Sequence, residues 1–232
     1  KKSTPKQSLP NNPQLSTSEV DSCRLGSIIL ILVMIRKQKL INSSLYHIFN
    51  KSISKYTIFN SDFEFNRFIN IINYYLYKNP PVKYSRFLEY STEYQQKTKN
   101  SFVEENKLVE IIAYCLMPTH FHLILKQLKK SGVSILLGNI ENSYARYFNL
   151  AHRRSGPLWV GPFKNISINT NEQLLHLTRY IHLNPCSSNI VKYPHEWKFS
   201  SFREFIHNNA KDKMCNYFKY FDLSRNEYKT FV

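Results

Sequence analysis

The most informative segment of the sequence runs from Leu108 to Leu125 and reads LVEIIAYCLMPTHFHLIL. Its apolar and β-branched residues favour β-strand. Pro118 has no backbone N–H to donate to a sheet, so it divides the stretch into LVEIIAYCLM and THFHLIL. We therefore predict two strands here, joined as a hairpin or a kinked pair.

The segments before this pair alternate between strand and helix patterns. LYHIFN, from Leu45 to Asn50, is short and aromatic and is typical of a first strand. Asn60-Ser61-Asp62 then offers helix-capping side chains, and apolar residues recur at steps of three and four until the chain reaches Pro80. Residues 82–107 are polar and charged, which predicts a long loop or insertion.

The second half of the chain continues the alternation. We predict a helix from Ser134 to about His152 and a strand in KNISI, residues 164–168. A third helix is expected to begin at Thr170, which forms a T-x-x-Q capping box with Gln173, and to run to Asn184-Pro185. The order strand, helix, strand, strand, helix, strand, helix predicts an α+β fold, with an antiparallel sheet covered by helices on one side.

The charge balance indicates an anionic partner. The chain has 32 Lys and Arg against 16 Asp and Glu, a formal net charge of +16, while 42% of its residues are hydrophobic, enough for a core. A basic surplus on a folded domain most often serves nucleic acid, and an anionic membrane surface is the main rival. The five glycines form neither GxGxxG nor GK[ST], which argues against a P-loop enzyme.

The cysteines indicate the cellular setting, and the composition along the chain indicates the domain organisation. The four cysteines form no CxxC pair, which argues against a zinc knuckle and favours a reducing, cytoplasmic setting. The apolar run from Ile28 to Ile35 is far shorter than the roughly 20 residues that cross a bilayer, so we interpret it as a buried or packing segment. We expect an N-terminal extension over 1–43, disordered to about residue 25, a folded domain over 44–205, and a C-terminal extension over 206–232.

Two histidines in the most informative segment could carry chemistry. His120 and His122 share one face of a strand, while Phe121 points the other way. Such a pair can bind one metal ion, although it can equally be a polar strand face with ordinary hydrogen bonds. A metal site needs a third ligand, and the register of the nearby Cys115 is disturbed by Pro118.

The predicted third helix carries a second set of candidate groups. His176, Tyr180 and Asn184 follow one another at four-residue steps and form one stripe. A neighbouring apolar stripe is formed by Leu174, Leu177 and Ile181. The helix can therefore pack on the sheet and present a phenol and an amide to it. By spacing alone, Tyr180 could equally be a structural aromatic and Asn184 a residue that ends the helix before proline.

Four motifs occur together, and their order and spacing resemble one known family. They are YCLMPTHFHLIL (114–125), GPLWVGPFKN (156–165), RYIHLNP (179–185) and EWKFSSF (196–202). The chain resembles the REP-associated tyrosine transposases, a branch of the single-tyrosine HUH (IS200-like) transposases, over about residues 44–205. The resemblance implies a ferredoxin-like sheet of the HUH endonuclease type. It also implies that Tyr180 is the catalytic nucleophile and that Asn184 joins His120 and His122 as a metal ligand.

The activity that the resemblance implies is cleavage and rejoining of single-stranded DNA. A magnesium or manganese ion would act as a Lewis acid, and Tyr180 would form a 5′-phosphotyrosine that a DNA 3′-hydroxyl can reverse. The expected partner is DNA with stem-loop, REP-like ends, in a bacterial, nucleoid-associated setting without a membrane, and the protein would act as a monomer or homodimer. His176 is a candidate proton acceptor. Candidate phosphate contacts, each also interpretable as a solvated surface charge, are Lys164, Arg153, Arg154 and Arg179.

Three departures from the family pattern concern DNA recognition. Thr119 stands where Asn usually precedes the first His, Pro162 stands at a usually basic position, and residues 186–189 read CSSN where a VRAG-like stretch is usual. Two other functions stay open at this point. One is a non-catalytic protein that binds DNA hairpins and derives from a transposase. The other is a metal-dependent hydrolase or oxygenase, for which the sequence offers no matching carboxylate motif.

Overall fold

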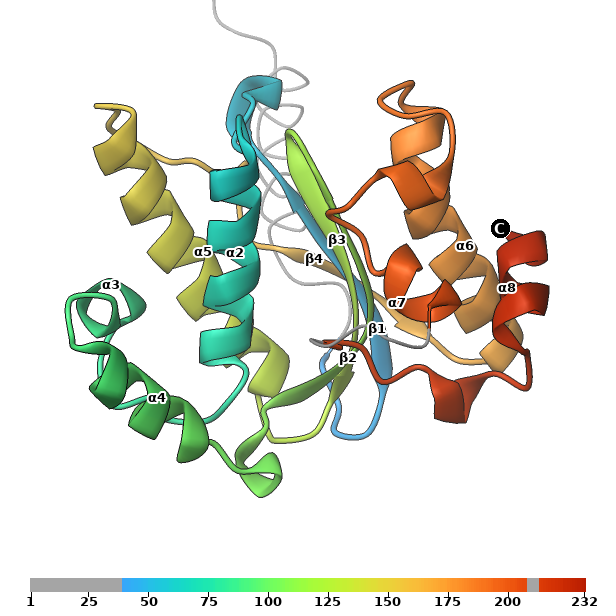
Figure 1. Cartoon of the computed structure of the whole chain (residues 1–232), viewed down its shortest axis with the longest axis horizontal. Helices are drawn as coiled ribbons and strands as arrows, with labels where there is room; N and C mark the ends of the chain where they lie inside the picture. The colour runs from blue at the N-terminus through green and yellow to red at the C-terminus, as the bar shows by residue number, and fades with distance from the viewer. Residues whose placement is uncertain (1–38, 208–212) are drawn as a thin grey trace, which may run out of the picture. The chain divides into compact units, whose positions relative to one another are not determined.

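The computed structural model describes residues 39–207 and 213–232. Within them, four strands form one antiparallel sheet in the order β2-β3-β1-β4 (Figure 1). The strands are β1 Leu45–Lys51, β2 Val109–Met117, β3 His120–Gln127 and β4 Lys164–Ile168. Together with α2 (Asp62–Tyr75) in the crossover from β1 to β2, which also contains two shorter helices, and α5 (Gly132–Ala151) in the crossover from β3 to β4, this order is the ferredoxin-like βαββαβ arrangement, so the predicted fold class is confirmed. The predicted disorder of residues 1 to about 25 and the apolar run at 28–35 fall outside the described residues.

Helices cover both faces of the sheet. Helices α2 and α5 lie on one side of it (Figure 1). Helix α6 (Asn171–Ser187) lies on the other side, with the short helices α7 (Phe202–Ile206) and α8 (Arg225–Phe231) (Figure 1). The prediction of helices on one side only was therefore wrong. The reason is visible in β2 and β3, which are buried almost without interruption and so present apolar side chains to both faces.

Residues 82–107 do not form a long loop, which was one of the two possibilities that we predicted from their polarity, the other being an insertion. They contain helices α3 (Tyr84–Phe87) and α4 (Thr92–Asn100). The aromatic rings of α3 pack on the end of α2, where the ring centroids of Tyr84 and Phe87 lie 5.2 Å and 4.7 Å from that of Tyr74. A few aromatic anchors thus fix a segment whose other residues are polar. Short 3-10 helices complete the described structure at Ile53–Lys55, Glu104–Asn106, Pro194–Glu196 and Phe218–Tyr220.

Helix α6 begins where the capping pattern predicts and ends later than predicted. The Thr170 hydroxyl accepts a hydrogen bond from the Gln173 N–H at 3.1 Å. The Gln173 side chain accepts from the N–H of Asn169 at 2.9 Å, so the reciprocal bond of the predicted box is displaced by one residue. The helix continues through the buried Pro185 to Ser187, although proline has no N–H to donate to the preceding turn.

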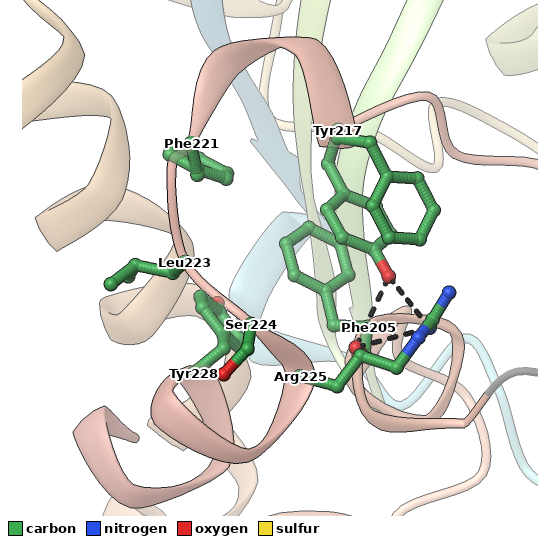
Figure 2. A pocket seen from close by; sticks show the side chains of 8 residues that line it. Phe205, Tyr217, Phe221, Leu223, Ser224, Arg225 and Tyr228 are labelled. Carbon is green, nitrogen blue, oxygen red and sulfur yellow. Dashed lines mark hydrogen bonds between the residues drawn. The ribbon is translucent and has the colours of Figure 1, made fainter.

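The described part of the C-terminal segment packs on α6 and α7. The ring of Tyr217 stacks on that of Phe205 with centroids 3.6 Å apart, and Arg225 Nη1 donates to the Tyr217 hydroxyl at 3.1 Å (Figure 2). Further along, the Tyr228 hydroxyl lies 2.8 Å from Nδ1 of the buried His182 on α6. The segment is therefore bound to the layer that contains α6. Among the described residues, no helix is both long and apolar enough to span a bilayer.

Candidate active site

The two histidines of β3 lie on the sheet face that α6 covers. Phe121, between them, is fully buried toward the other layer, where its ring centroid lies 5.3 Å from that of Phe68 on α2. His120 and His122 point to the opposite face, with ring centroids 5.1 Å apart and ring planes at 89°. The strand alternation that the sequence predicts is therefore present in the structure.

Helix α6 brings Tyr180 and Asn184 to these histidines. The centroid of the Tyr180 ring lies 5.9 Å from that of His122, with the rings edge to face at 81°. One turn further along the helix, the Asn184 side chain lies beside His120. Tyr180 is 53% exposed, which leaves its hydroxyl accessible to a large substrate. The four residues that the resemblance selects therefore lie together, and their chemical roles stay predictions.

A third histidine, which our sequence analysis missed, completes the cluster. His47 lies on β1, and its Nε2 atom is 2.9 Å from Nδ1 of His122. The two ring planes are 25° apart, with centroids 5.1 Å apart, so the rings meet at their edges. Alternation in LYHIFN places His47 and Phe49 on one face, but only the pairing of Phe49 with His122 in the sheet shows that this face belongs to the site. The sequence does not contain that pairing.

Burial keeps all three imidazoles neutral. It lowers the pKa of His47 to about 4 and, together with the neighbouring His47 and His120, the pKa of His122 to about 3. Burial also lowers the pKa of His120, an effect that the neighbouring Asn184 side chain opposes and the charge of Lys51 reinforces. Neutral imidazole is the form that can bind a metal ion.

The donor groups suit a divalent cation. His120 and His122 offer two neutral imidazoles, and Asn184 offers an amide oxygen. In the part of the chain that the structure describes, no three His, Cys, Asp or Glu side chains are grouped so that they could hold a metal. A metal at this site would therefore depend on the amide of Asn184 as its third protein ligand.

Cys115, the local alternative to Asn184, is a poor ligand. It lies directly opposite His122 in the β2–β3 ladder and is fully buried. Its Sγ atom lies 3.8 Å from Sδ of Met117. Burial raises the pKa of the Cys115 thiol far above its usual value, and metals bind the thiolate rather than the thiol.

Two lysines lie on the same sheet face as the histidines. Lys164 on β4 is exposed and pairs with Phe49, which in turn pairs with His122 on the other side of β1. Lys51 is exposed, stands directly opposite His120 in the β1–β3 ladder, and was missed in our sequence analysis. Because side chains of directly opposed residues share a face, both ammonium groups belong to the surface around the site.

The three candidate arginines lie in other settings. Arg154 donates to the Asn149 side chain at 2.9 Å and to the Pro157 carbonyl at 2.7 Å, contacts that hold the end of α5 on the opposite layer. Arg153, beside it, is exposed and has a φ of 49°. Arg179 is exposed on α6, with its guanidinium 5.0 Å from the centroid of the Phe231 ring. Of these, only Arg179 lies on the helix that carries Tyr180.

His176, the candidate proton acceptor, is exposed one turn before Tyr180. Its ring centroid lies 5.6 Å from that of Phe231 on α8. Both His176 and Arg179 therefore contact the C-terminal helix, and the role of His176 stays a prediction.

Comparison with known proteins confirms the resemblance. Residues 81–184, which include His120, His122, Tyr180 and Asn184, match the family model described as "Transposase IS200 like". A solved structure of a REP-associated tyrosine transposase bound to a REP hairpin shares the fold, with a TM-score of 0.51, 17% identity, and coverage of 82% of this chain and 94% of that one. A putative transposase from Deinococcus radiodurans R1 gives a TM-score of 0.35 at 13% identity, over 64% of this chain and 95% of that one. No curated protein matches this sequence.

Proposed function

We propose that this protein is a metal-dependent DNA transposase that cleaves and rejoins single-stranded hairpin DNA through a 5′-phosphotyrosine intermediate. The proposal depends mainly on one observation, which is that side chains from helix α6 lie next to side chains from strand β3. Tyr180 comes from α6 with its ring centroid 5.9 Å from that of His122 on β3, and Asn184 lies beside the neighbouring His120. The match of residues 81–184 to the IS200-like transposases supports this class of reaction over hydrolysis or oxygenation.

His120, His122 and Asn184 would hold one magnesium or manganese ion. When bound, the ion would supply Lewis-acid activation of the scissile phosphate. Two imidazoles among three protein ligands favour manganese over magnesium in affinity, because magnesium prefers oxygen donors.

Tyr180 is the proposed nucleophile. Its phenolic oxygen bonds to the phosphorus, the bond from phosphorus to the 3′-oxygen breaks, and the DNA leaves with a free 3′-hydroxyl. Attack by a second 3′-hydroxyl on the phosphotyrosine reverses these changes and joins new ends. The attacking phenol must lose its proton, and His176 is the candidate acceptor.

The proposed partner is DNA with stem-loop ends. A protein of similar fold has been solved with a REP hairpin bound, and the net charge of +16 here suits a polyanion. Lys51 and Lys164 lie on the histidine face, where they would contact the phosphates that flank the scissile bond. We expect the reaction in the bacterial cytoplasm, at the nucleoid, by a monomer or a homodimer.

The test is covalent capture on a labelled stem-loop. Incubation of the protein with single-stranded hairpin DNA and manganese should give an adduct that survives a denaturing gel, and peptide mapping should place the label on Tyr180. The variant Tyr180→Phe should lose the adduct and retain DNA binding. The matched control is Tyr193→Phe, at an exposed tyrosine whose ring stacks on His195, and it should keep the adduct. Hairpin binding without any adduct in the unaltered protein would instead support the non-catalytic alternative.

A further inference from the structure

The contact between His47 and His122 depends on which of the two facing ring nitrogens carries a proton. Nε2 of His47 lies 2.9 Å from Nδ1 of His122, and both residues are 93% buried, so these two nitrogens are in contact with little access to water. A neutral imidazole carries one N–H and one lone pair. A hydrogen bond between the two rings therefore needs one of these nitrogens as donor and the other as acceptor.

Only one of the two arrangements leaves His122 able to bind a cation. If His47 donated from Nε2, His122 would carry its own proton on Nε2 and would have no lone pair left for a metal. If His122 donates from Nδ1, its Nε2 lone pair is free. The second arrangement also matches the general habit of metal-binding histidines, which donate the other ring N–H to a neighbouring acceptor.

We propose that His47 is a positioning residue that accepts the Nδ1–H of His122 and thereby holds Nε2 of His122 ready for the metal ion. The inference rests on the proposed function, because it assumes the cation site at His120, His122 and Asn184. His47 itself contributes no ligand, because its Nε2 lone pair is engaged by His122 and its proton is on Nδ1. The rings of His47 and His122 meet edge to edge with their planes only 25° apart, and the ring of His47 also lies 4.9 Å from that of Phe49 between centroids, contacts that fix the ring orientation.

Two substitutions separate this role from simple packing. His47→Phe keeps an aromatic ring in the core and removes the acceptor. His47→Gln keeps an amide oxygen that can accept from Nδ1 of His122. The matched control is His195→Phe, which removes a histidine stacked on Tyr193 away from the sheet.

The first readout is binding of Mn²⁺ alone, measured calorimetrically on the full chain without DNA. We expect His47→Phe to weaken Mn²⁺ binding by roughly 10- to 100-fold, the usual effect of losing such a partner. His47→Gln should recover most of the affinity, and His195→Phe should leave it unchanged. Unchanged affinity in His47→Phe, or an equal loss in both His47 variants, would overturn the proposal.

The second readout is the position of the His122 proton, from nitrogen-15 NMR of the imidazoles in the metal-free protein. The unaltered chain should show His122 protonated on Nδ1, and a proton on Nε2 would contradict the proposal even if His47→Phe failed to fold. Failure of the unaltered protein to bind Mn²⁺ would overturn the metal site of the proposed function and the purpose assigned to His47 with it. If only the role proposed for His47 is wrong, the unaltered protein will still bind Mn²⁺.

Discussion

Glu110 on β2 and Lys219 in the C-terminal segment form an ion pair of 2.6 Å that binds the end of the chain to the sheet. The same carboxylate accepts hydrogen bonds from the Asn216 side chain at 2.6 Å and the Tyr220 hydroxyl at 2.7 Å. Glu110 lies at the start of β2, where this strand forms one edge of the sheet. One carboxylate therefore anchors much of the segment that leads to α8, the helix packed beside the candidate nucleophile's helix.

Replacement of Glu110 by Gln should change how stability depends on pH. Burial alone would raise the pKa of Glu110, but the bonds from Lys219 and Tyr220 outweigh it and hold the pKa below its usual 4.5. The stabilisation is thus complete above about pH 4.5 and is lost as the pH falls below that value, because the unfolded chain takes up the proton first. Urea unfolding from pH 7 to 3.5 should show a lower free energy of unfolding for Glu110→Gln at pH 7 and a smaller loss on acidification.

The control for this pH dependence is Glu89→Gln, which removes an exposed pair with Arg86 one helical turn away. Exposed pairs of this kind contribute little, so its pH profile should follow that of the unaltered chain. Parallel profiles for Glu110→Gln and the unaltered protein would contradict the anchoring role.

Lys51 should contribute to DNA affinity through its charge. It is exposed and stands opposite His120, beside the proposed position of the scissile phosphate. Lys51→Gln should weaken hairpin binding and reduce the slope of log affinity against log salt by about 0.7, the value for one phosphate contact on a single strand. Lys99→Gln, at an exposed residue of α4, is the control and should leave the slope unchanged. Equal slopes for all three proteins, measured by fluorescence anisotropy, would exclude Lys51 from the interface.

Two glycines of α5 provide a matched test of backbone packing. A Cβ atom on Gly132 would lie 2.3 Å from the Leu108 carbonyl oxygen, so Gly132→Ala must displace the start of β2 or of α5. A Cβ atom on Gly138 would meet nothing within 4 Å, and alanine is the better helix former by about 1 kcal/mol. Thermal unfolding should therefore show Gly132→Ala to be destabilised and Gly138→Ala to be equal to or more stable than the unaltered chain. The reverse order would mean that the approach of Gly132 to Leu108 is not part of the fold.

The sequence predicted most of the sheet because its signals are local. Pro118 marks the turn between β2 and β3, and the alternation in THFHLIL places His120 and His122 on one face whatever surrounds them. The sequence did not show that the predicted helices cover both faces of the sheet, because a continuous apolar run does not say how many faces of a strand are covered.

His47 and Lys51 were missed for a different reason. Their place in the site depends on the register of β1 against β3, which is a contact between residues more than 60 positions apart. Nothing in LYHIFNK marks that partner. The helices within residues 82–107 were not predicted from the polar composition, because Tyr84 and Phe87 of α3 find their packing partner on α2.

The last prediction concerns His182, the histidine of the RYIHLNP motif that the proposed chemistry does not use. Its side chain is completely buried, its Nδ1 lies 2.8 Å from the Tyr228 hydroxyl, and its Nε2 lies 2.7 Å from the Ser201 hydroxyl. Ser201 in turn donates to the Tyr114 carbonyl on β2, so the network joins α8, α6 and the sheet.

Tyr228→Phe removes one hydroxyl from this network and leaves a buried nitrogen of His182 without its partner, which should cost about 1–3 kcal/mol of unfolding free energy. Hydrogen exchange should quicken in α8 and in α6 around Tyr180, because the hydroxyl connects the two helices. Tyr193→Phe, which alters an exposed ring, is the control and should change neither quantity. If Tyr228→Phe left both stability and exchange unaltered, the C-terminal helix would have no part in holding the helix that carries Tyr180.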